Sequence, residues 1–496
     1  MTSLKRRATA GMIWSSIESW GQQLLQFALF AVLARLLGPE AFGIVAMAMI
    51  LTTFANLLVL HGGWNEALVQ RPDLDPRHTD SAFWALLAGA VVLAAVVAVA
   101  ARPLAAALEQ PSLAAVTAAL GLSLPLGVLG VVPAALLRRE FRFAPLALRT
   151  LFGTVAAGLV AVPMALAGYG VWSLVAFQLT MPAIQTAVLW QAHPWRPGLR
   201  FSRPHLRELG GYVAGVLGER SLLAVEIVVP LIVVGAAAGA AALGHFTTAR
   251  KILDLMIDLL VKPVTQVAMP SFAGAAADAA RVRTVLTVGT QVAALLVFPG
   301  HVGLILVAPD LVPLIFGAAW TPVVPVLQVM ALSGLALPFV MLTTALMHGT
   351  GHTTAQLGVA VLSTAVFVLL LLAMPGSSLV QVALAYVLRS AILLPVRFRT
   401  VRRVTGIDPL PSLRATVPLI LAAALMAAAV LAVQHASDGL VGPLLAVLRD
   451  AAVGGLVYVA AVALLGRRLV TDLAGSLRSL ARVRGAAAGT GDVAAV

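Results

Sequence analysis

The 496-residue sequence contains no cysteine. Disulfide bonds, catalytic thiols and thiolate metal sites are therefore excluded. Charged residues are also scarce, at 11% of the chain, whereas 60% of the residues are hydrophobic. A chain of this length cannot bury so much apolar surface in ordinary soluble domains, and its mean hydropathy of +0.99 indicates a membrane protein.

Sequence motifs for nucleotide binding and for hydrolysis are absent as well. No G-x-x-x-x-G-K-[ST], G-x-S-x-G or H-E-x-x-H pattern occurs. The histidines His245, His348 and His352 have no carboxylate or histidine partner at the spacing of metal ligands. We therefore expect a protein that is not an enzyme and that uses neither a metal nor a cofactor.

Apolar runs long enough to cross a bilayer recur along the chain. The segment SAFWALLAGAVVLAAVVAVAA (81–101) spans about 30 Å as a helix, which matches the hydrocarbon core of a membrane. We expect an all-α polytopic membrane protein with about fourteen transmembrane helices. These helices are expected at residues 11–34, 41–60, 81–101, 114–136, 145–166, 171–191, 209–234, 240–262, 286–307, 323–346, 353–374, 378–396, 413–433 and 443–465.

Positive charges gather in alternate connections between these helices. They are frequent at both ends and in even-numbered loops, for example Arg138, Arg139 and Arg142, and rare in odd-numbered loops. Loops with many positive charges stay in the cytoplasm, so both termini are expected there. These loops also account for the net charge of +13, which therefore does not indicate a nucleic-acid partner. Polar residues after Lys5 favour a polar first helix over a cleaved signal. Arg389, near the cytoplasmic end of the twelfth helix, is interpreted as a snorkelling anchor.

A weak internal repeat divides the chain. An offset of 201 residues places Gly43 on Gly244 and Glu18 on Glu219. Six helices per copy give two lobes of the same orientation, related by a parallel pseudo-two-fold axis. We expect an N-terminal lobe over 8–192 with helices 1–6, a C-terminal lobe over 205–398 with helices 7–12, two extra helices over 412–466, and a disordered cytoplasmic tail over 467–496.

The segment FTTARKILDLMIDLLVKPV (246–264) is spaced like an apolar helix but carries Arg250, Lys251, Asp254, Asp258 and Lys262. Each charge would cost about 2.5–3.5 kcal/mol at the centre of a lipid-facing helix. A spacing of i, i+4, i+8 and i+12 keeps four of them on one face, where intrahelical pairs neutralise part of the stripe. We expect the rest to line a cavity; for Asp258 and Lys262, an anchor in the cytoplasmic headgroups is the alternative.

Two other expected helices also have polar faces. Glu219 and Glu226 share a face of the seventh helix, with Arg220 beside them. The first helix contributes a polar line that consists of Ser15, Glu18 with Ser19, Gln22 and Gln26. Polar faces on helices 1, 7 and 8 indicate the lining of an aqueous pathway, and a structural polar seam between lobes is the alternative.

Six short stretches together resemble a known family. They are ARLLGPEAFGIVAMAMI (34–50), NEALVQRPDLDPRHTDSAFW (65–84), LLRREFRF (136–143), GYGVWSLV (168–175), ALGHFTTARKI (242–252) and LIFGAAWTPVVPVLQVMAL (314–332). In this order they resemble the lipopolysaccharide and exopolysaccharide repeat-unit exporters of the multidrug/oligosaccharidyl-lipid/polysaccharide superfamily, in the branch similar to the colanic acid exporter. The resemblance covers about residues 8–465.

The resemblance implies a flippase of the bacterial inner membrane. Such proteins move undecaprenyl-pyrophosphate-linked oligosaccharide repeat units from the cytoplasmic to the periplasmic leaflet by alternating access. Coupling to H⁺ or Na⁺ would drive the change of state. The implied partners are membrane lipids, the lipid-linked oligosaccharide, a polysaccharide polymerase and chain-length machinery.

This resemblance gives the polar faces distinct roles. Arg250, Lys251 and Arg220 would bind the pyrophosphate, because cations in a low-dielectric cavity attract a dense anion strongly. The residues expected to hydrogen-bond to sugar hydroxyls are Glu18, Gln22 and Gln26. The candidates for ion coupling are Glu219, Glu226, Asp254 and Asp258. The seventh helix reads LAVEIVVPLIVVG where many family members have an Asn/Asp pair, which leaves the coupling residues open.

Other functions fit the sequence less well. A drug or organic-cation antiporter of the same superfamily is the alternative, but its cavity should be net acidic and aromatic. A membrane-bound polymerase or ligase would need a long periplasmic loop to hold sugars, and all odd-numbered loops are short. A passive scaffold would leave the intramembrane charges unexplained.

Overall fold

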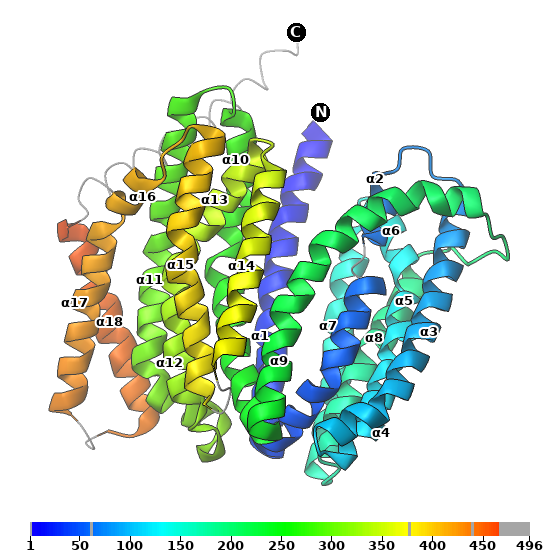
Figure 1. The fold of residues 1–496 in the computed structure, drawn as a ribbon, viewed down its shortest axis with the longest axis horizontal. Helices are drawn as coiled ribbons and strands as arrows, with labels where there is room; N and C mark the ends of the chain where they lie inside the picture. The colour runs from blue at the N-terminus through cyan, green and yellow to red at the C-terminus, as the bar shows by residue number, and fades with distance from the viewer. Residues whose placement is uncertain (1, 60–62, 375–377, 438–440, 466–496) are drawn as a thin grey trace. The chain divides into compact units, whose positions relative to one another are not determined.

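The structure is a computed structural model that describes residues 2–59, 63–374, 378–437 and 441–465. The side chains of residues 2–20, 58, 59, 215, 219 and 223 are outside this description, and Glu18 and Glu219 are among them. The tail expected to be disordered, 467–496, is outside it as well. Every regular element in the described segments is a helix, in the order that Figure 1 shows. The predicted all-α class is therefore confirmed.

The described residues include twelve helices that are long and apolar enough to cross a membrane. Two of them are far longer than one crossing requires, because α1 (Thr2–Val59) and α9 (Arg203–Leu260) each contain 58 residues. At 1.5 Å per residue, each would extend about 87 Å if it were straight. The chain is thus a multi-pass membrane protein, while the count of fourteen helices and the placement of both termini in the cytoplasm stay predictions.

The helices form two compact units. The first contains residues 1–255, 315–326 and 360–389, and the second contains residues 256–314, 327–359 and 390–496. Helices of the first unit are α1, α2 (Trp64–Gln70), α3 (Pro76–Ala107), α4 (Pro111–Gly121), α5 (Ser123–Val128), α6 (Val131–Arg139), α7 (Phe143–Leu166), α8 (Val171–Ala192) and most of α9. It also includes η1 (Ala318–Trp320) and parts of α14 (Thr353–Ala373) and α15 (Leu379–Thr405).

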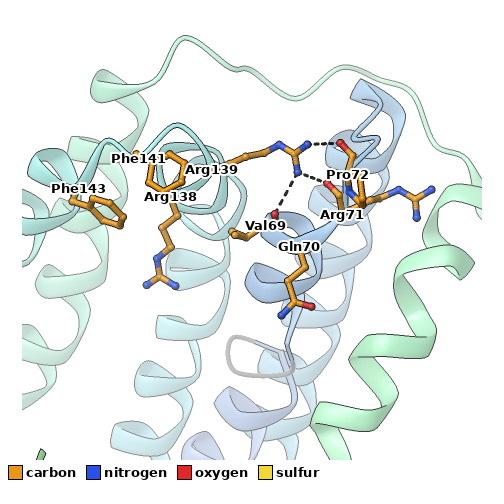
Figure 2. Close-up of a pocket in the computed structure, with 8 residues that line it drawn as sticks. All are labelled: Val69, Gln70, Arg71, Pro72, Arg138, Arg139, Phe141 and Phe143. Carbon is orange, nitrogen blue, oxygen red and sulfur yellow. Dashed lines mark hydrogen bonds between the residues drawn. The ribbon is translucent and has the colours of Figure 1, made fainter. Parts of the chain in front are cut away.

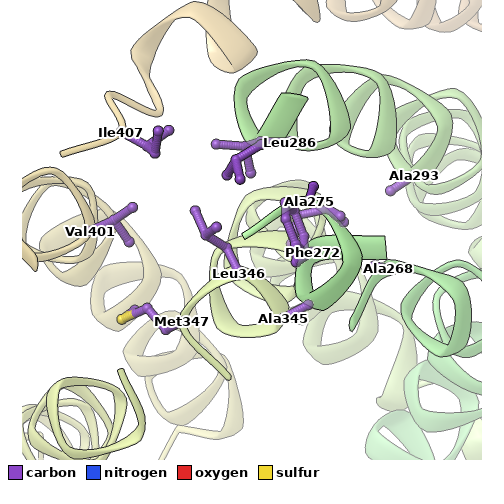
Figure 3. Close-up of a cluster of buried hydrophobic side chains, with 12 residues drawn as sticks. Ala268, Phe272, Ala275, Leu286, Ala293, Ala345, Leu346, Met347, Val401 and Ile407 are labelled. Atoms are coloured by element: carbon purple, nitrogen blue, oxygen red, sulfur yellow. The ribbon is translucent and has the colours of Figure 1, made fainter. Parts of the chain in front are cut away.

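The second unit is built around buried apolar side chains. Its elements include α10 (Lys262–Ala275), most of α11 (Ala279–Phe316), most of α12 (Val323–Ser333), η2 (Gly334–Ala336), α13 (Leu337–Gly349), α16 (Leu410–Ala415), α17 (Val417–Ala436) and α18 (Pro443–Leu465). Figure 3 shows the cluster in which Phe272 of α10, Leu346 of α13 and Val401 of α15 meet, all of them fully buried. Because lipid tails are as apolar as these side chains, van der Waals contacts between closely packed residues hold such helices together in a membrane.

Two expected interhelical connections are short kinks at a glycine. The sequence predicts a break after residue 34 and another after residue 234, and α1 and α9 are each two helices joined across a non-helical glycine in these breaks, Gly38 (φ 74°) and Gly239 (φ 79°). A positive φ is strained for side-chain-bearing residues and free of that cost for glycine, so each helix changes direction there without a loop. The two glycines are separated by the 201 residues of the predicted repeat, which supports its register.

Gly43 and Gly244, at equivalent positions of the repeat, lie where α1 and α9 cross within the first unit. A Cβ on Gly43 would lie 1.7 Å from the carbonyl oxygen of Ala240, and a Cβ on Gly244 would lie 2.0 Å from that of Pro39. Each glycine therefore lies directly against the backbone just after the kink of the other helix. Contacts this close require the absence of a side chain, as in many crossings of membrane helices.

Two other expected helices are interrupted. Residues 114–136 divide among α4, α5 and α6, and residues 323–346 divide among α12, η2 and α13. Pro125 and Pro338 lie in the first turn of α5 and α13, where a proline needs no backbone hydrogen-bond donor. Proline thus explains why a continuously apolar segment does not form one continuous helix.

The α1–α9 crossing gives a direct prediction for stability. Gly43→Ala should destabilise the protein by about 1–3 kcal/mol, because its methyl group would overlap the Ala240 backbone. Gly89→Ala in α3 is the control, since no atom lies within 4 Å of the added Cβ there, and it should be neutral or stabilise by up to about 1 kcal/mol. The measurement is the melting temperature of each detergent-purified variant by fluorescence-detected size-exclusion chromatography. Equal melting temperatures for both variants would contradict the close crossing.

Candidate functional site

Most of the charges that the sequence places in the membrane belong to the long kinked helix α9. Glu226 precedes the kink at Gly239 by about 20 Å of helix and Arg250 follows it by about 17 Å, at 1.5 Å per residue. Both side chains contact α15 in the first compact unit, at Arg389 and Tyr386 respectively. The kink therefore brings the two arms of α9 to one face of a third helix.

Glu226 is the centre of this arrangement. Its Oε2 lies 3.0 Å from Nη1 of Arg389, and its Oε1 accepts a hydrogen bond of 2.9 Å from the hydroxyl of Thr364 in α14. Both carboxylate oxygens thus have a partner. The two charged side chains are only 27% and 21% exposed, so the pair is largely removed from solvent. Charge-assisted hydrogen bonds are strongest under these conditions.

Aromatic rings complete the surroundings of Arg389. Its guanidinium carbon lies 4.6 Å from the centre of the Phe367 ring and 5.6 Å from that of Tyr386. The two rings contact each other edge to face, with centroids 4.6 Å apart. A cation above aromatic faces is stabilised further by the ring quadrupoles, particularly where water is scarce. Arg389 is therefore fixed in place from several sides.

Arg250 extends the same network through Tyr386. Its Nη1 donates a hydrogen bond of 3.1 Å to the Tyr386 hydroxyl, and its Nε lies 3.9 Å from the carboxylate of Asp254, one helical turn later. The Arg250–Asp254 pair confirms the predicted intrahelical pairing at i, i+4. The positive charges of Arg250 and Arg389 thus match the negative charges of Glu226 and Asp254 in this cluster.

The structure divides the predicted charged stripe between the two compact units. Arg250, Lys251 and Asp254 belong to the first unit, whereas Asp258 and Lys262 belong to the second. In the second unit, the amine of Lys262 lies 2.5 Å from the carboxylate of Asp258, again at i, i+4. Asp258 is thus neutralised by its own neighbour, and its predicted role in coupling stays a prediction.

The remaining predicted site residues lie apart from this cluster of contacts. Arg220 lines a small hollow beside Phe54 and Leu57 of α1. Lys251, Gln22 and Gln26 are partly buried, and no hydrogen bond or ion pair of theirs occurs among the residues that the structure describes. For Glu18 and Glu219, whose side chains are outside the description, the predicted roles stay predictions.

The interpretation of Arg389 as a snorkelling anchor is wrong. Its guanidinium pairs with Glu226 and lies over two rings, so protein groups hold this side chain. Sequence reasoning also missed Thr364, Phe367 and Tyr386. One signal was present: Tyr386 and Arg389 are three residues apart, on one helical face, in a span that contains no acidic residue to pair with the arginine.

A double-mutant cycle tests the central ion pair. Arg389→Ala alone should cost about 1–3 kcal/mol, because it leaves the Glu226 carboxylate largely buried without its cationic partner. The double variant Arg389→Ala with Glu226→Gln should be more stable than the sum of the single changes predicts, by about 1 kcal/mol or more. Thermal or denaturant unfolding of the purified variants measures these differences. Additive effects would show that the two side chains do not interact.

Comparisons with known proteins agree with this architecture. The family model for polysaccharide biosynthesis proteins matches residues 32–325. The chain is 29% identical over 329 residues to the succinoglycan biosynthesis transport protein ExoT of Rhizobium meliloti (66% of each chain), and 25% identical over 340 residues to the teichuronic acid biosynthesis protein TuaB of Bacillus subtilis (68% of this chain, 70% of the relative). The alignments thus span about two thirds of these relatives' length.

Solved structures show the same fold at low sequence identity. The lipid II flippase MurJ, in an inward-closed conformation, superimposes with a TM-score of 0.73 over 92% of this chain and 100% of its own, at 13% identity. An inward-facing multidrug transporter of the MATE family superimposes with a TM-score of 0.57 over 77% of this chain and 95% of its own, at 16% identity. With twelve apolar helices among the residues that the structure describes, the chain is a multi-pass protein of the bacterial inner membrane and belongs to the family of polysaccharide biosynthesis proteins.

Proposed function

We propose that this protein is a flippase that moves undecaprenyl-pyrophosphate-linked oligosaccharides from the cytoplasmic to the periplasmic leaflet by alternating access. Membership of the polysaccharide biosynthesis family carries the proposal, since a relative in this comparison bears the name of a transport protein for succinoglycan biosynthesis. The polytopic fold, which resembles that of a lipid II flippase, is consistent with it. In this role the protein is a transporter and performs no enzymatic reaction.

The pyrophosphate of the substrate requires cations that are not already engaged. Arg250 has Tyr386 and Asp254 as partners, whereas Lys251 and Arg220 form no ion pair or hydrogen bond with other described residues. A substrate anion that binds Lys251 or Arg220 therefore displaces no partner among the described side chains. Of the three cations that the sequence suggests, we assign the primary contacts to these two and a supporting role to Arg250.

The Glu226–Arg389 pair offers a route for coupling to an ion gradient. A proton or Na⁺ that binds the Glu226 carboxylate competes with the Arg389 guanidinium for the same oxygens. Because Glu226 is on α9, Thr364 on α14 and Arg389 on α15, ion binding would weaken contacts among three helices at once. An ion can shift a conformational equilibrium only if it binds one state better than the other, and loss of this pair supplies such a difference.

Lipid analysis of a deletion strain tests the proposed activity. Loss of the gene should cause lipid-linked oligosaccharide to accumulate and surface polymer to fall, as measured by mass spectrometry and polymer quantification. At matched protein level, Lys251→Ala combined with Arg220→Ala should reproduce this phenotype, because the anion site is removed. Arg281→Ala, which removes an exposed charge at the start of α11, should complement fully.

The deletion strain tests the flippase activity, and the double variant tests the proposed anion site. Accumulation in the deletion strain but not in the double variant would retain the flippase and reject the two cations. No accumulation in the deletion strain would reject the flippase itself, and dye efflux would then be measured to test the drug-antiporter alternative.

Glu226→Gln tests coupling in proteoliposomes. The amide keeps the shape of the side chain and can still accept from Thr364, but it has no charge for a proton or Na⁺ to neutralise. An imposed ion gradient should accelerate transport by wild-type protein by about tenfold and leave the variant unaffected, in line with typical coupling free energies. Arg281→Ala should respond like wild type. A gradient response that survives in Glu226→Gln would exclude Glu226 as the coupling residue.

A further inference from the structure

A second candidate site, with a largely apolar lining and several arginines, lies where α2, α6 and α7 end or begin. A hollow there has a volume of about 610 Å³. Figure 2 shows the residues that line it, which are Val69, Gln70, Arg71, Pro72, Arg138, Arg139, Phe141 and Phe143. Its volume is within the range of about 300–1,000 Å³ that is usual for small-molecule sites. Arg139 ends one candidate membrane span and Phe143 begins the next, so the hollow lies at the depth of the lipid headgroups.

The two adjacent arginines of α6 have different roles. Arg139 donates hydrogen bonds to the carbonyl oxygens of Arg71 and Pro72, the latter at 2.6 Å, and so satisfies backbone acceptors just beyond the end of α2. Arg138 is exposed, extends to a different side of α6 in Figure 2, and has no hydrogen bond or ion pair with any described residue. Arg139 fixes the wall of the hollow, and Arg138 is available for a ligand.

Acidic side chains nearby are already engaged. Glu140 accepts a hydrogen bond from the His193 ring at 3.1 Å and lies 3.5 Å from the Arg142 guanidinium. The hydrogen bond from His193 lowers the pKa of the Glu140 carboxyl, which keeps it ionised and bound to these partners. Glu208 pairs in the same way with Arg71 and His78. No acid among the described residues neutralises Arg138.

Phe141, in the apolar part of the hollow, has a strained backbone conformation. Phe141 is 80% exposed and has φ 56°, in a region that bulky residues rarely adopt. Its ring packs edge to face on Phe143, which is 45% exposed, with centroids 6.3 Å apart. Strained residues of this kind often cluster at ligand sites, where the strain presents a side chain to the ligand.

We propose that this hollow binds an anionic phospholipid, with the phosphodiester on Arg138 and the first part of the hydrocarbon chain against Phe141 and Phe143. An uncommitted guanidinium beside exposed aromatic rings matches an anion that continues into an apolar chain. The resident lipid is favoured over the lipid-linked substrate because one free guanidinium suits a singly charged phosphodiester. The site is separate from the Glu226 cluster and does not depend on the proposed transport.

Native mass spectrometry of the delipidated full chain tests the proposal. Titration with phosphatidylglycerol should show a tight site whose affinity falls about tenfold in Arg138→Ala, since a charge-assisted contact is lost. Affinity for phosphatidylcholine should change far less, because its headgroup is zwitterionic. Arg281→Ala, an exposed arginine at the start of another candidate span, is the matched control and should bind like wild type.

Phe141→Gly separates lipid binding from folding. Glycine tolerates the positive φ at this position, so the variant should melt at the same or a higher temperature than wild type. It should nevertheless bind phosphatidylglycerol several-fold more weakly, because the aromatic contact with the chain is lost. Because Arg138→Ala and Phe141→Gly remove different contacts with the lipid, either variant tests the site if the other is unstable.

Three results would overturn the proposal. Arg138→Ala and Arg281→Ala could lower phosphatidylglycerol binding equally, which would indicate non-specific attraction to the charged surface. Phe141→Gly could bind phosphatidylglycerol like wild type, which would show that the Phe141 ring does not contact the hydrocarbon chain. Arg138→Ala could weaken binding of undecaprenyl phosphate or inorganic phosphate but not of phosphatidylglycerol, which would assign the hollow to another phosphate source.

Discussion

The close approach of the α1 and α9 backbones is the contact on which the candidate site depends. Gly43 and Gly244 each face a carbonyl oxygen of the other helix, and no larger residue could occupy either position without displacement. Each helix also changes direction at a glycine, so the two arms of α9 can both reach α15. Backbone geometry thus positions Glu226 and Arg250, and the side-chain contacts follow from it.

Electrostatics explain why the charges of α9 are tolerated in an apolar chain. Desolvation penalises every isolated charge in the membrane, and the structure offsets this penalty by pairing. Glu226 is paired across helices with Arg389, while Arg250 and Asp254 pair within one helical turn. Lys251 and Arg220 have no such partner among the described residues, which distinguishes a structural set of charges from a set that can receive a substrate anion.

Arg138 and Arg139 illustrate the same distinction at the membrane surface. They are adjacent in the sequence and chemically identical, yet one satisfies backbone carbonyls near the end of α2 and the other is exposed without a protein partner. Because successive helical residues point about 100° apart, neighbours on a helix routinely face different surroundings. The two arginines in the last turn of α6 therefore have different roles, one in packing and the other in the proposed lipid contact.

The sequence by itself determined the fold class, the register of the repeat and the helix that contains the candidate site. Hydropathy, charge distribution and the i, i+4 spacing of Arg250 and Asp254 are local properties that any window of the chain reveals. Only the tertiary structure decided that two expected loops are glycine kinks, that prolines interrupt two apolar segments, and that Arg389 is the partner of Glu226. An ion pair between α9 and α15 requires distant segments to pack at one register, and that register results from backbone contacts such as Gly43 with Ala240.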